Sequence, residues 1–111
     1  MNPATLKALK GSIRKWELIV ARKEEDRGPR NCPLCKLFIW KPRCEGCPVS
    51  EKTGQSGCGG SPYVRWANLT EENISYYADT PEKIAAAKDE LKFLKSLLPK
   101  RRRKNVKRTK S

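Results

Sequence analysis

Five cysteines are the residues of this sequence best suited to chemistry. Four of them form two C-x₂-C units with eight residues between the units, and the fifth follows eleven positions later: Cys32, Cys35, Cys44, Cys47 and Cys58. In a C-x₂-C turn both thiolates can reach one tetrahedral ion at about 2.3 Å. Gly46, inside the second unit, can take the positive φ that such a turn requires. The spacing therefore predicts a structural zinc site.

Two sets of four ligands fit this spacing. The paired set, which we favour, contains Cys32, Cys35, Cys44 and Cys47, whereas in the second set Cys58 replaces Cys44. Cys58 could also act as an additional ligand. The eight residues between the pairs can fold back on themselves, so we expect a zinc knuckle hairpin. An iron–sulfur cluster is the alternative cofactor because a fifth thiol is present, and a redox dithiol or disulfides are further alternatives.

The sequence gives little support for catalysis. The sequence has no histidine for general base work or for activating a cysteine, and it has neither a G-x-S-x-G motif nor a phosphate-binding loop. Four thiolate ligands would also leave zinc no open position for a catalytic water. The acidic runs 24–26 and 71–72 are interpreted as solvated faces or helix ends. We therefore expect a non-catalytic protein, not an enzyme.

The positive charge of the chain is concentrated at its C-terminal end. The formal net charge is +13, and residues 100–111 contain no acid and eight basic residues, namely Lys100, Arg101, Arg102, Arg103, Lys104, Lys107, Arg108 and Lys110. Such a segment can contact successive phosphates of a nucleic acid, with an affinity that falls as salt is added. It has almost nothing apolar to bury, so we expect disorder. Targeting, solubility and a protein partner are the alternative roles.

Aromatic residues offer a second route to nucleic acid. Five of them could stack on bases if they are exposed beside a basic groove: Trp40, Trp66, Tyr63, Tyr76 and Tyr77. A small metal-centred domain also needs large apolar side chains to complete its core. We therefore expect Trp16 and Trp66 to pack in the core, whereas Trp40 is compatible with either role.

The elements that must hold the cysteines are two amphipathic helices. In the first, Asn2 is a cap candidate, Pro3 suits the first helical position, and Gly28–Pro29 is the predicted stop. Its apolar residues follow a 3, 4, 3, 4 spacing: Leu6, Leu9, Ile13, Trp16 and Val20.

The second helix uses the same signals, with Thr80 as the cap, Pro81 at the first position and Pro99 as the stop. It repeats the spacing at Ile84, Ala87, Leu91, Leu94 and Leu98. One or two short helical turns are expected at 62–79. We predict a mainly α-helical fold in which these two long helices form an antiparallel pair flanking a cysteine-rich metal-binding insert.

One zinc-stabilised domain is expected over residues 1–99, with the cysteine-rich insert at 30–62 and the basic tail at 100–111. No secretory signal is visible, and apolar runs such as Leu18–Ala21, which no other run exceeds in length, are too short to span a membrane. We therefore expect no membrane partner and a cytoplasmic location, where thiols remain reduced and available for metal.

Several motifs in residues 14–99 resemble those of small uncharacterised cysteine-rich proteins encoded by bacteriophages. They are, in order, C-P-x-C, C-x-G-C-P, Thr53-Gly54, Cys58, Pro62-Tyr63, Trp66 and the helix end at 90–99. The resemblance implies a phage protein made in the cytoplasm of a bacterial host. It implies no particular biochemical activity.

Together these observations predict a non-catalytic, phage-encoded zinc-binding protein that binds nucleic acid through its basic tail. The alternative is a protein-interaction or inhibitor module that binds a host protein, in host takeover or in blocking a bacterial defence.

Overall fold

The computed structural model of the chain describes residues 1–55, 58–73 and 75–99. Its elements are α1 (Pro3–Val20), η1 (Gly28–Asn31), α2 (Pro33–Phe38), η2 (Pro42–Cys44), α3 (Pro48–Thr53), α4 (Tyr63–Asn73) and α5 (Pro81–Ser96). Helices are thus the only regular elements in this part of the chain, which confirms the predicted mainly α-helical fold. The basic tail at 100–111 lies outside the described residues.

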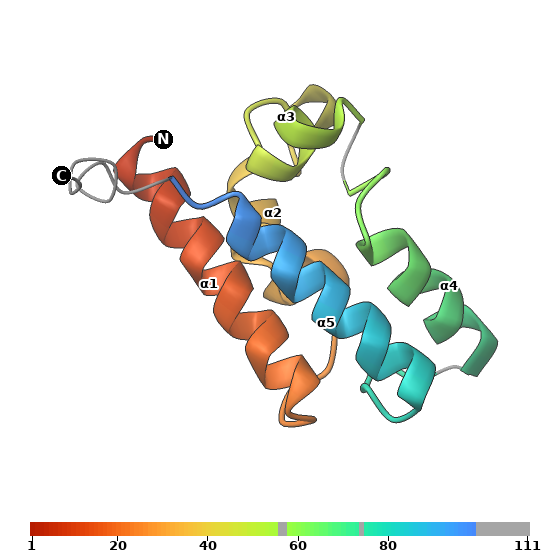
Figure 1. The fold of residues 1–111 in the computed structure, drawn as a ribbon. Coiled ribbons are helices and arrows are strands. Elements are labelled where there is room, and N and C mark those ends of the chain that lie inside the picture. The colour runs from red at the N-terminus through yellow and green to blue at the C-terminus, as the bar shows by residue number, and fades with distance from the viewer. Residues whose placement is uncertain (56–57, 74, 100–111) are drawn as a thin grey trace, which may run out of the picture.

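The two long helices α1 and α5 lie side by side and run in opposite directions (Figure 1). Each begins where its capping residue predicts. The Asn2 side chain accepts a hydrogen bond from the Thr5 N–H at 2.8 Å, and the Thr80 hydroxyl accepts one from the Lys83 N–H at 3.1 Å. In both helices proline occupies the first turn, where a missing N–H costs nothing. Local capping therefore fixes the register of both long helices.

The ends of the helices differ from the sequence prediction in two places. Helix α1 ends at Val20, so the predicted stop at Gly28–Pro29 was wrong. The chain leaves the helix because Arg22 takes the left-handed conformation, with a φ of 61°. Helix α4 has 11 residues and is longer than the one or two turns expected there.

The shorter helices cover the remaining sides of this pair. Helix α2 packs on α1, and α4 packs on α5 (Figure 1) while its Tyr63 and Trp66 rings also contact Trp16 of α1. The start of α1 and the end of α5 meet at one end of the molecule, where Met1 and Leu97 line a shallow cleft with Gly46 and Pro48 of the cysteine-rich insert. The insert is therefore packed against the end of the pair at which both described termini lie.

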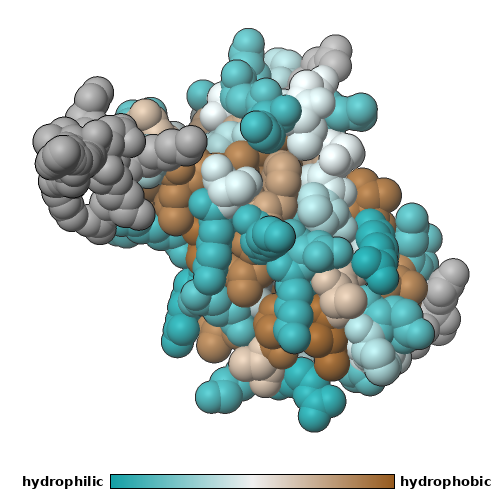
Figure 2. Space-filling view, viewed as in Figure 1, coloured by the Kyte–Doolittle hydropathy of each residue, from teal (hydrophilic) through white to brown (hydrophobic). Residues whose placement is uncertain are grey.

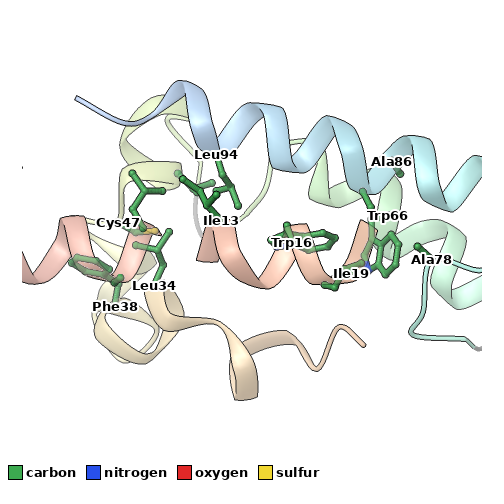
Figure 3. Close-up of a cluster of buried hydrophobic side chains, with 14 residues drawn as sticks. Ile13, Trp16, Ile19, Leu34, Phe38, Cys47, Trp66, Ala78, Ala86 and Leu94 are labelled. Atoms are coloured by element: carbon green, nitrogen blue, oxygen red, sulfur yellow. The ribbon is translucent and has the colours of Figure 1, made fainter. Parts of the chain in front are cut away.

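The apolar core runs along the inner faces of α1 and α5 (Figure 3). Of the ten apolar stripe positions predicted in the two helices, those that are fully buried are Leu9, Ile13, Trp16, Ala87 and Leu94, and the others are half-buried. At its centre the Trp16 ring meets the edge of the Trp66 ring, with 5.2 Å between centroids. Trp66 has no exposed surface, so the prediction that both indoles pack in the core is confirmed. Outside this core, hydrophilic side chains cover most of the face formed by α1 and α5 (Figure 2).

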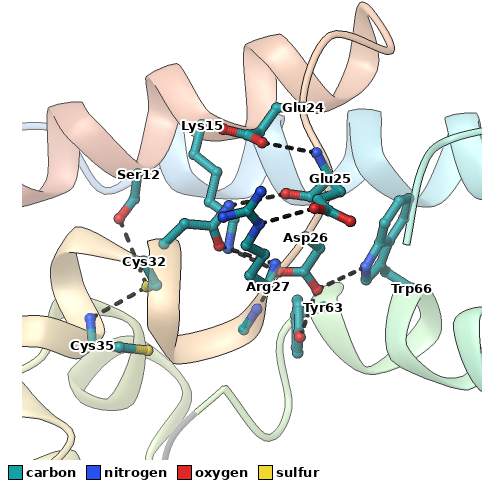
Figure 4. Close-up of polar contacts among 12 residues, drawn as sticks. Ser12, Lys15, Glu24, Glu25, Asp26, Arg27, Cys32, Cys35, Tyr63 and Trp66 are labelled. Carbon is teal, nitrogen blue, oxygen red and sulfur yellow. Dashed lines mark hydrogen bonds and ion pairs between the residues drawn. The ribbon is translucent and has the colours of Figure 1, made fainter. Parts of the chain in front are cut away.

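A buried carboxylate joins the loop after α1 to both α1 and α4. Asp26 Oδ1 accepts hydrogen bonds from Lys15 Nζ at 2.8 Å and from the Gly28 N–H at 2.9 Å. Its Oδ2 accepts from the Tyr63 hydroxyl at 2.8 Å and from the Trp66 indole N–H at 3.0 Å (Figure 4). The interpretation of residues 24–26 as a solvated face was therefore wrong for Asp26, whose side chain is 5% exposed.

The electrostatics of this network follow from its burial. Burial alone favours the protonated carboxyl, but the Lys15 ammonium and the hydrogen bonds hold the pKa of Asp26 below its ordinary value. Lys15 is equally buried, with a side chain that is 6% exposed. A pair of this kind is costly to break from one side only, because the remaining charge is left without a partner in a dry environment.

We therefore expect Asp26→Asn to reduce the free energy of unfolding by about 3–5 kcal/mol at neutral pH. The control Asp89→Asn breaks an exposed ion pair with Arg65 and should stay within about 0.5 kcal/mol of wild type. Urea unfolding measures both.

The pH dependence of the Asp26→Asn effect gives a further check. Because the pKa of Asp26 is lower in the folded than in the unfolded state, its stabilisation is complete above the unfolded pKa of about 4 and is lost as the pH falls. The difference in the free energy of unfolding between wild type and the variant should therefore decrease as the pH falls. A difference that is small at pH 7, or that increases as the pH falls, would contradict this account.

Candidate metal centre

All five cysteine side chains line one cavity of about 200 Å³ between α1, the insert and α5. They are free thiols, and they come from α2, η2, the start of α3 and the turn that precedes α4. Apolar side chains form much of the wall: Trp16, Leu34, Phe38, Val49 and Leu94. The structure thus brings together every cysteine that the sequence singled out, including the two in which the predicted ligand sets differ.

The first cysteine pair is positioned by the start of α2. Cys32 is the N-cap residue, Pro33 follows it at the first helical position, and the Cys35 N–H donates to Cys32 Sγ at 3.2 Å. The hydroxyl oxygen of Ser12, in α1, lies 4.0 Å from the same sulfur (Figure 4). The same oxygen accepts a hydrogen bond from the Leu34 N–H at 3.4 Å. The first pair is therefore attached to α1 by polar contacts as well as by packing.

A tight turn positions the second pair. Cys44 ends η2 with a φ of 55°, Cys47 is the N-cap residue of α3, and the Cys47 N–H bonds to the Cys44 carbonyl at 3.0 Å. Between them Gly46 has a φ of 93°, which confirms its predicted positive value. A Cβ at Gly46 would lie 3.1 Å from the Phe38 ring, so this position requires glycine for space as well as for conformation.

The link between the two pairs contains the end of α2 and the 3₁₀ turn η2, and no strand is found in the described insert. The expected zinc knuckle hairpin is therefore not confirmed. Each helical piece of the insert begins with proline, at Pro33, Pro42 and Pro48. Proline fixes φ at the first helical position, which favours short helical turns over extended chain here.

Cys58 lines the cavity from the turn that precedes α4. Its carbonyl accepts from the Ser61 N–H at 3.2 Å and from the Ser61 hydroxyl at 2.7 Å, which holds the turn before α4. Burial and the nearby charge of Glu90 raise the pKa of the Cys58 thiol to about 12.

The thiols differ in how readily they ionise. A hydrogen bond from the Cys35 side chain lowers the pKa of Cys32 to about 6, against the opposing effect of burial. The same hydrogen bond, together with burial, raises the pKa of Cys35. Burial also raises the pKa of Cys47. The thiolate form is thus favoured at Cys32, whereas burial favours the protonated form at Cys35, Cys47 and Cys58.

Sequence reasoning missed Glu90, which lines the same cavity from α5. Its side chain is almost completely buried, and its Oε1 has no hydrogen-bond partner among the described residues. Burial, followed by the charge of Cys32, raises the pKa of Glu90 to about 8. The missed signal is its spacing, because Ala87, Glu90 and Leu94 continue the 3, 4 period of the buried face.

The side chains as placed do not form a metal site. In the described part of the chain, no group of three or more His, Cys, Asp or Glu side chains has a geometry that could hold a metal ion. Zinc binding by Cys32, Cys35, Cys44 and Cys47 thus stays a prediction, as does the role of Cys58.

No family model, curated protein or solved structure matches this chain. The resemblance to cysteine-rich phage proteins therefore stays a prediction. None of the helices in the described ranges has both the length and the apolar character needed to cross a membrane.

The aromatic residues proposed for base stacking fall into separate groups. Trp66 is fully buried, and the hydroxyl of the half-buried Tyr63 donates a hydrogen bond to Asp26. Trp40 is 75% exposed, and Tyr76 and Tyr77 are also exposed. The eight basic residues of the tail lie outside the described residues.

The turn of the second cysteine pair can be tested with two glycines that share a positive φ. Gly46→Ala should destabilise by about 1–2 kcal/mol through backbone strain and by a further 1–3 kcal/mol, roughly, because the new methyl group crowds Phe38. Gly54→Ala, at a φ of 74° with no atom within 4 Å, should incur the strain alone. Denaturant unfolding measures the difference, and equal losses would show that Phe38 does not restrict Gly46.

Proposed function

We propose that this chain is a zinc-stabilised helical protein that binds nucleic acid through its basic C-terminal segment. The zinc proposal is carried by one observation: five thiols gather around one cavity, together with a Glu90 oxygen that has no hydrogen-bond partner in the described ranges. An unsatisfied buried oxygen of an ionisable group is rare and costly. A divalent cation near it would offset this cost and would convert the surrounding thiols to thiolates.

Charge balance favours a cation in this cavity. Among the described residues that line the cavity, Lys15 is the one with a basic side chain, and Asp26 already engages its ammonium at 2.8 Å. Zn²⁺ displaces thiol protons on binding, so the high pKa of Cys47 and of Cys58 is no barrier once the ion is present. Four sulfur ligands make a closed tetrahedral site, which is the pattern of structural zinc.

The helical pieces of the insert supply the reason for a structural ion. Helices α2 and α3 have six residues each and η2 has three, which is far below the length at which isolated helices are stable. The free energy of zinc binding to the cysteines beside these short helices would add directly to the free energy of folding of this region. We propose the paired set as ligands, with Cys58 as a fifth thiol beside it.

The zinc proposal predicts one tightly held zinc ion per chain, measured by elemental analysis of the purified protein. Serine in place of any paired-set cysteine (Cys32, Cys35, Cys44 or Cys47) should reduce zinc content and the melting temperature, because three thiolates hold the ion less tightly. Cys58→Ser is the matched control and should retain zinc.

The other outcomes of this experiment are equally clear. If Cys58→Ser loses zinc and Cys44→Ser retains it, the ligands are those of the second set, in which Cys58 replaces Cys44. Iron with visible absorbance would favour an iron–sulfur cluster. A protein that contains neither metal and is fully folded after exhaustive chelation would refute the structural role.

The nucleic-acid proposal rests on the distribution of charge. The segment 100–111 has eight basic residues and no acid, whereas residues 1–99 contain 17 basic and 12 acidic residues. Lysine and arginine that neutralise phosphates release counterions, and this supplies affinity without sequence specificity.

Exchange of all eight basic residues of this segment for glutamine should abolish most of the salt-dependent binding. With all eight engaged on duplex DNA, log K should fall with log salt at a slope approaching about −7. The control exchanges Arg101, Arg102 and Arg103 for lysine, which keeps the charge and should keep the slope. Fluorescence anisotropy over a salt series measures both. An unchanged slope in the glutamine variant would contradict the proposal.

A further inference from the structure

The cysteine-rich insert presents a tryptophan to solvent. Trp40 is 75% exposed, and Ile39 beside it is 50% exposed. By contrast, Trp16 is 3% exposed and Trp66 has no exposed surface. An exposed indole gains little from packing within the chain, so Trp40 is the large apolar residue of the described structure with the least intramolecular role.

The backbone on both sides of Trp40 is well anchored. Helix α2 ends at Phe38, whose ring is buried in the core, and the Ile39 N–H bonds to the Cys35 carbonyl at 2.8 Å. The Lys41 N–H then bonds to the Phe38 carbonyl at 2.9 Å, and η2 begins at the next residue. Trp40 is therefore presented by a hydrogen-bonded turn between two cysteines, and little conformational entropy remains to be lost on binding.

The sequence on both sides of this turn is basic. Residues 30–45 contain four basic residues and one acid: Arg30, Lys36, Lys41, Arg43 and Glu45. Lys36 lies one helical turn before Trp40, and Lys41 follows it directly; both are exposed. Neither lysine forms an ion pair with another residue that the structure describes. The Lys41 ammonium instead lies 5.5 Å from the centre of the Phe38 ring.

We propose that Trp40 is a base-stacking site for single-stranded nucleic acid, with Lys36 and Lys41 contacting the phosphates on either side. The proposal rests on the proposed nucleic-acid function and adds to it a contact in the folded body. Stacking on an exposed ring needs a base that is free of a partner strand, so single strands are the ligand class. The lysines decide against a protein partner, because the centres of protein interfaces are depleted of lysine.

The full-length protein with a labelled oligothymidylate tests this directly by fluorescence anisotropy at fixed salt. Trp40→Ala should weaken binding by roughly 5- to 150-fold, which is the range of one base–aromatic stack. Trp40→Phe should restore most of this loss because it keeps an aromatic face. The matched control is Val64→Ala, which removes an exposed apolar side chain of α4 from outside the insert and should leave the affinity unchanged.

Two further readouts separate stacking from charge. Oligothymidylate should quench the fluorescence of Trp40 selectively, because Trp16 and Trp66 are buried, and a duplex of the same length should quench it much less. Exchange of Lys36 and Lys41 for glutamine should reduce the salt slope by about 1.4, the value for two phosphate contacts on a single strand. The melting temperature of Trp40→Ala should match wild type, since the indole is exposed.

Several results would overturn the proposal. One is that Trp40→Ala binds with the wild-type affinity and that oligothymidylate does not quench the fluorescence of the wild-type protein. If binding still depends on salt through the C-terminal segment, the proposed function survives and the stacking site does not. Equal quenching by duplex and single strand would also reject it. So would a Trp40→Ala variant that changes self-association in sedimentation but binds oligothymidylate normally, because Trp40 would then contact a second copy of the chain.

Discussion

The fold depends on the carboxylate of Asp26 and the ammonium of Lys15, which meet in a region almost without solvent. Asp26 accepts four hydrogen bonds, and their donors come from α1, from the loop itself and from α4. These hydrogen bonds attach the loop to both helices whose tryptophans, Trp16 and Trp66, contact each other. The chain between Asp26 and Cys32 is short, so the same network also determines where the first cysteine pair begins. Lys15 belongs to both the Asp26 network and the cysteine site, because it also lines the cavity of the cysteines.

Local signals in the sequence were sufficient for the elements whose ends depend on neighbouring residues. The caps at Asn2 and Thr80, each followed by proline, gave the correct starts of α1 and α5. The positive φ at Gly46 was also predictable, since the spacing of its flanking cysteines implies a tight turn. The same spacing singled out all the thiols that meet at one cavity, although it did not determine the path of the chain between them.

Buried polar groups were not predictable, because their partners are distant in the sequence. Asp26 bonds to Tyr63 and Trp66, which lie 37 and 40 residues further along the chain. A carboxylate in an acidic run normally faces solvent, and only the folded structure reveals the four donors around this one. Glu90 was missed for a related reason: helical periodicity placed it on the inner face, but its charge argued for an exposed position. Propensity alone also did not predict that α1 would end at Val20, before the left-handed Arg22.

The meeting of the start of α1 and the end of α5 beside the insert has a consequence for how the chain could hold a long ligand. The chain leaves the described region at Pro99, next to Leu97, which shares a cleft with Gly46 and Pro48 of the insert. The basic segment 100–111 follows Pro99 in the sequence, and the turn of Trp40 belongs to the same insert as Gly46 and Pro48. Two weak contacts joined by a short tether raise each other's local concentration. A single nucleic-acid strand that engages both proposed contacts, the basic C-terminal segment and Trp40, would bind more tightly than it binds to either contact alone.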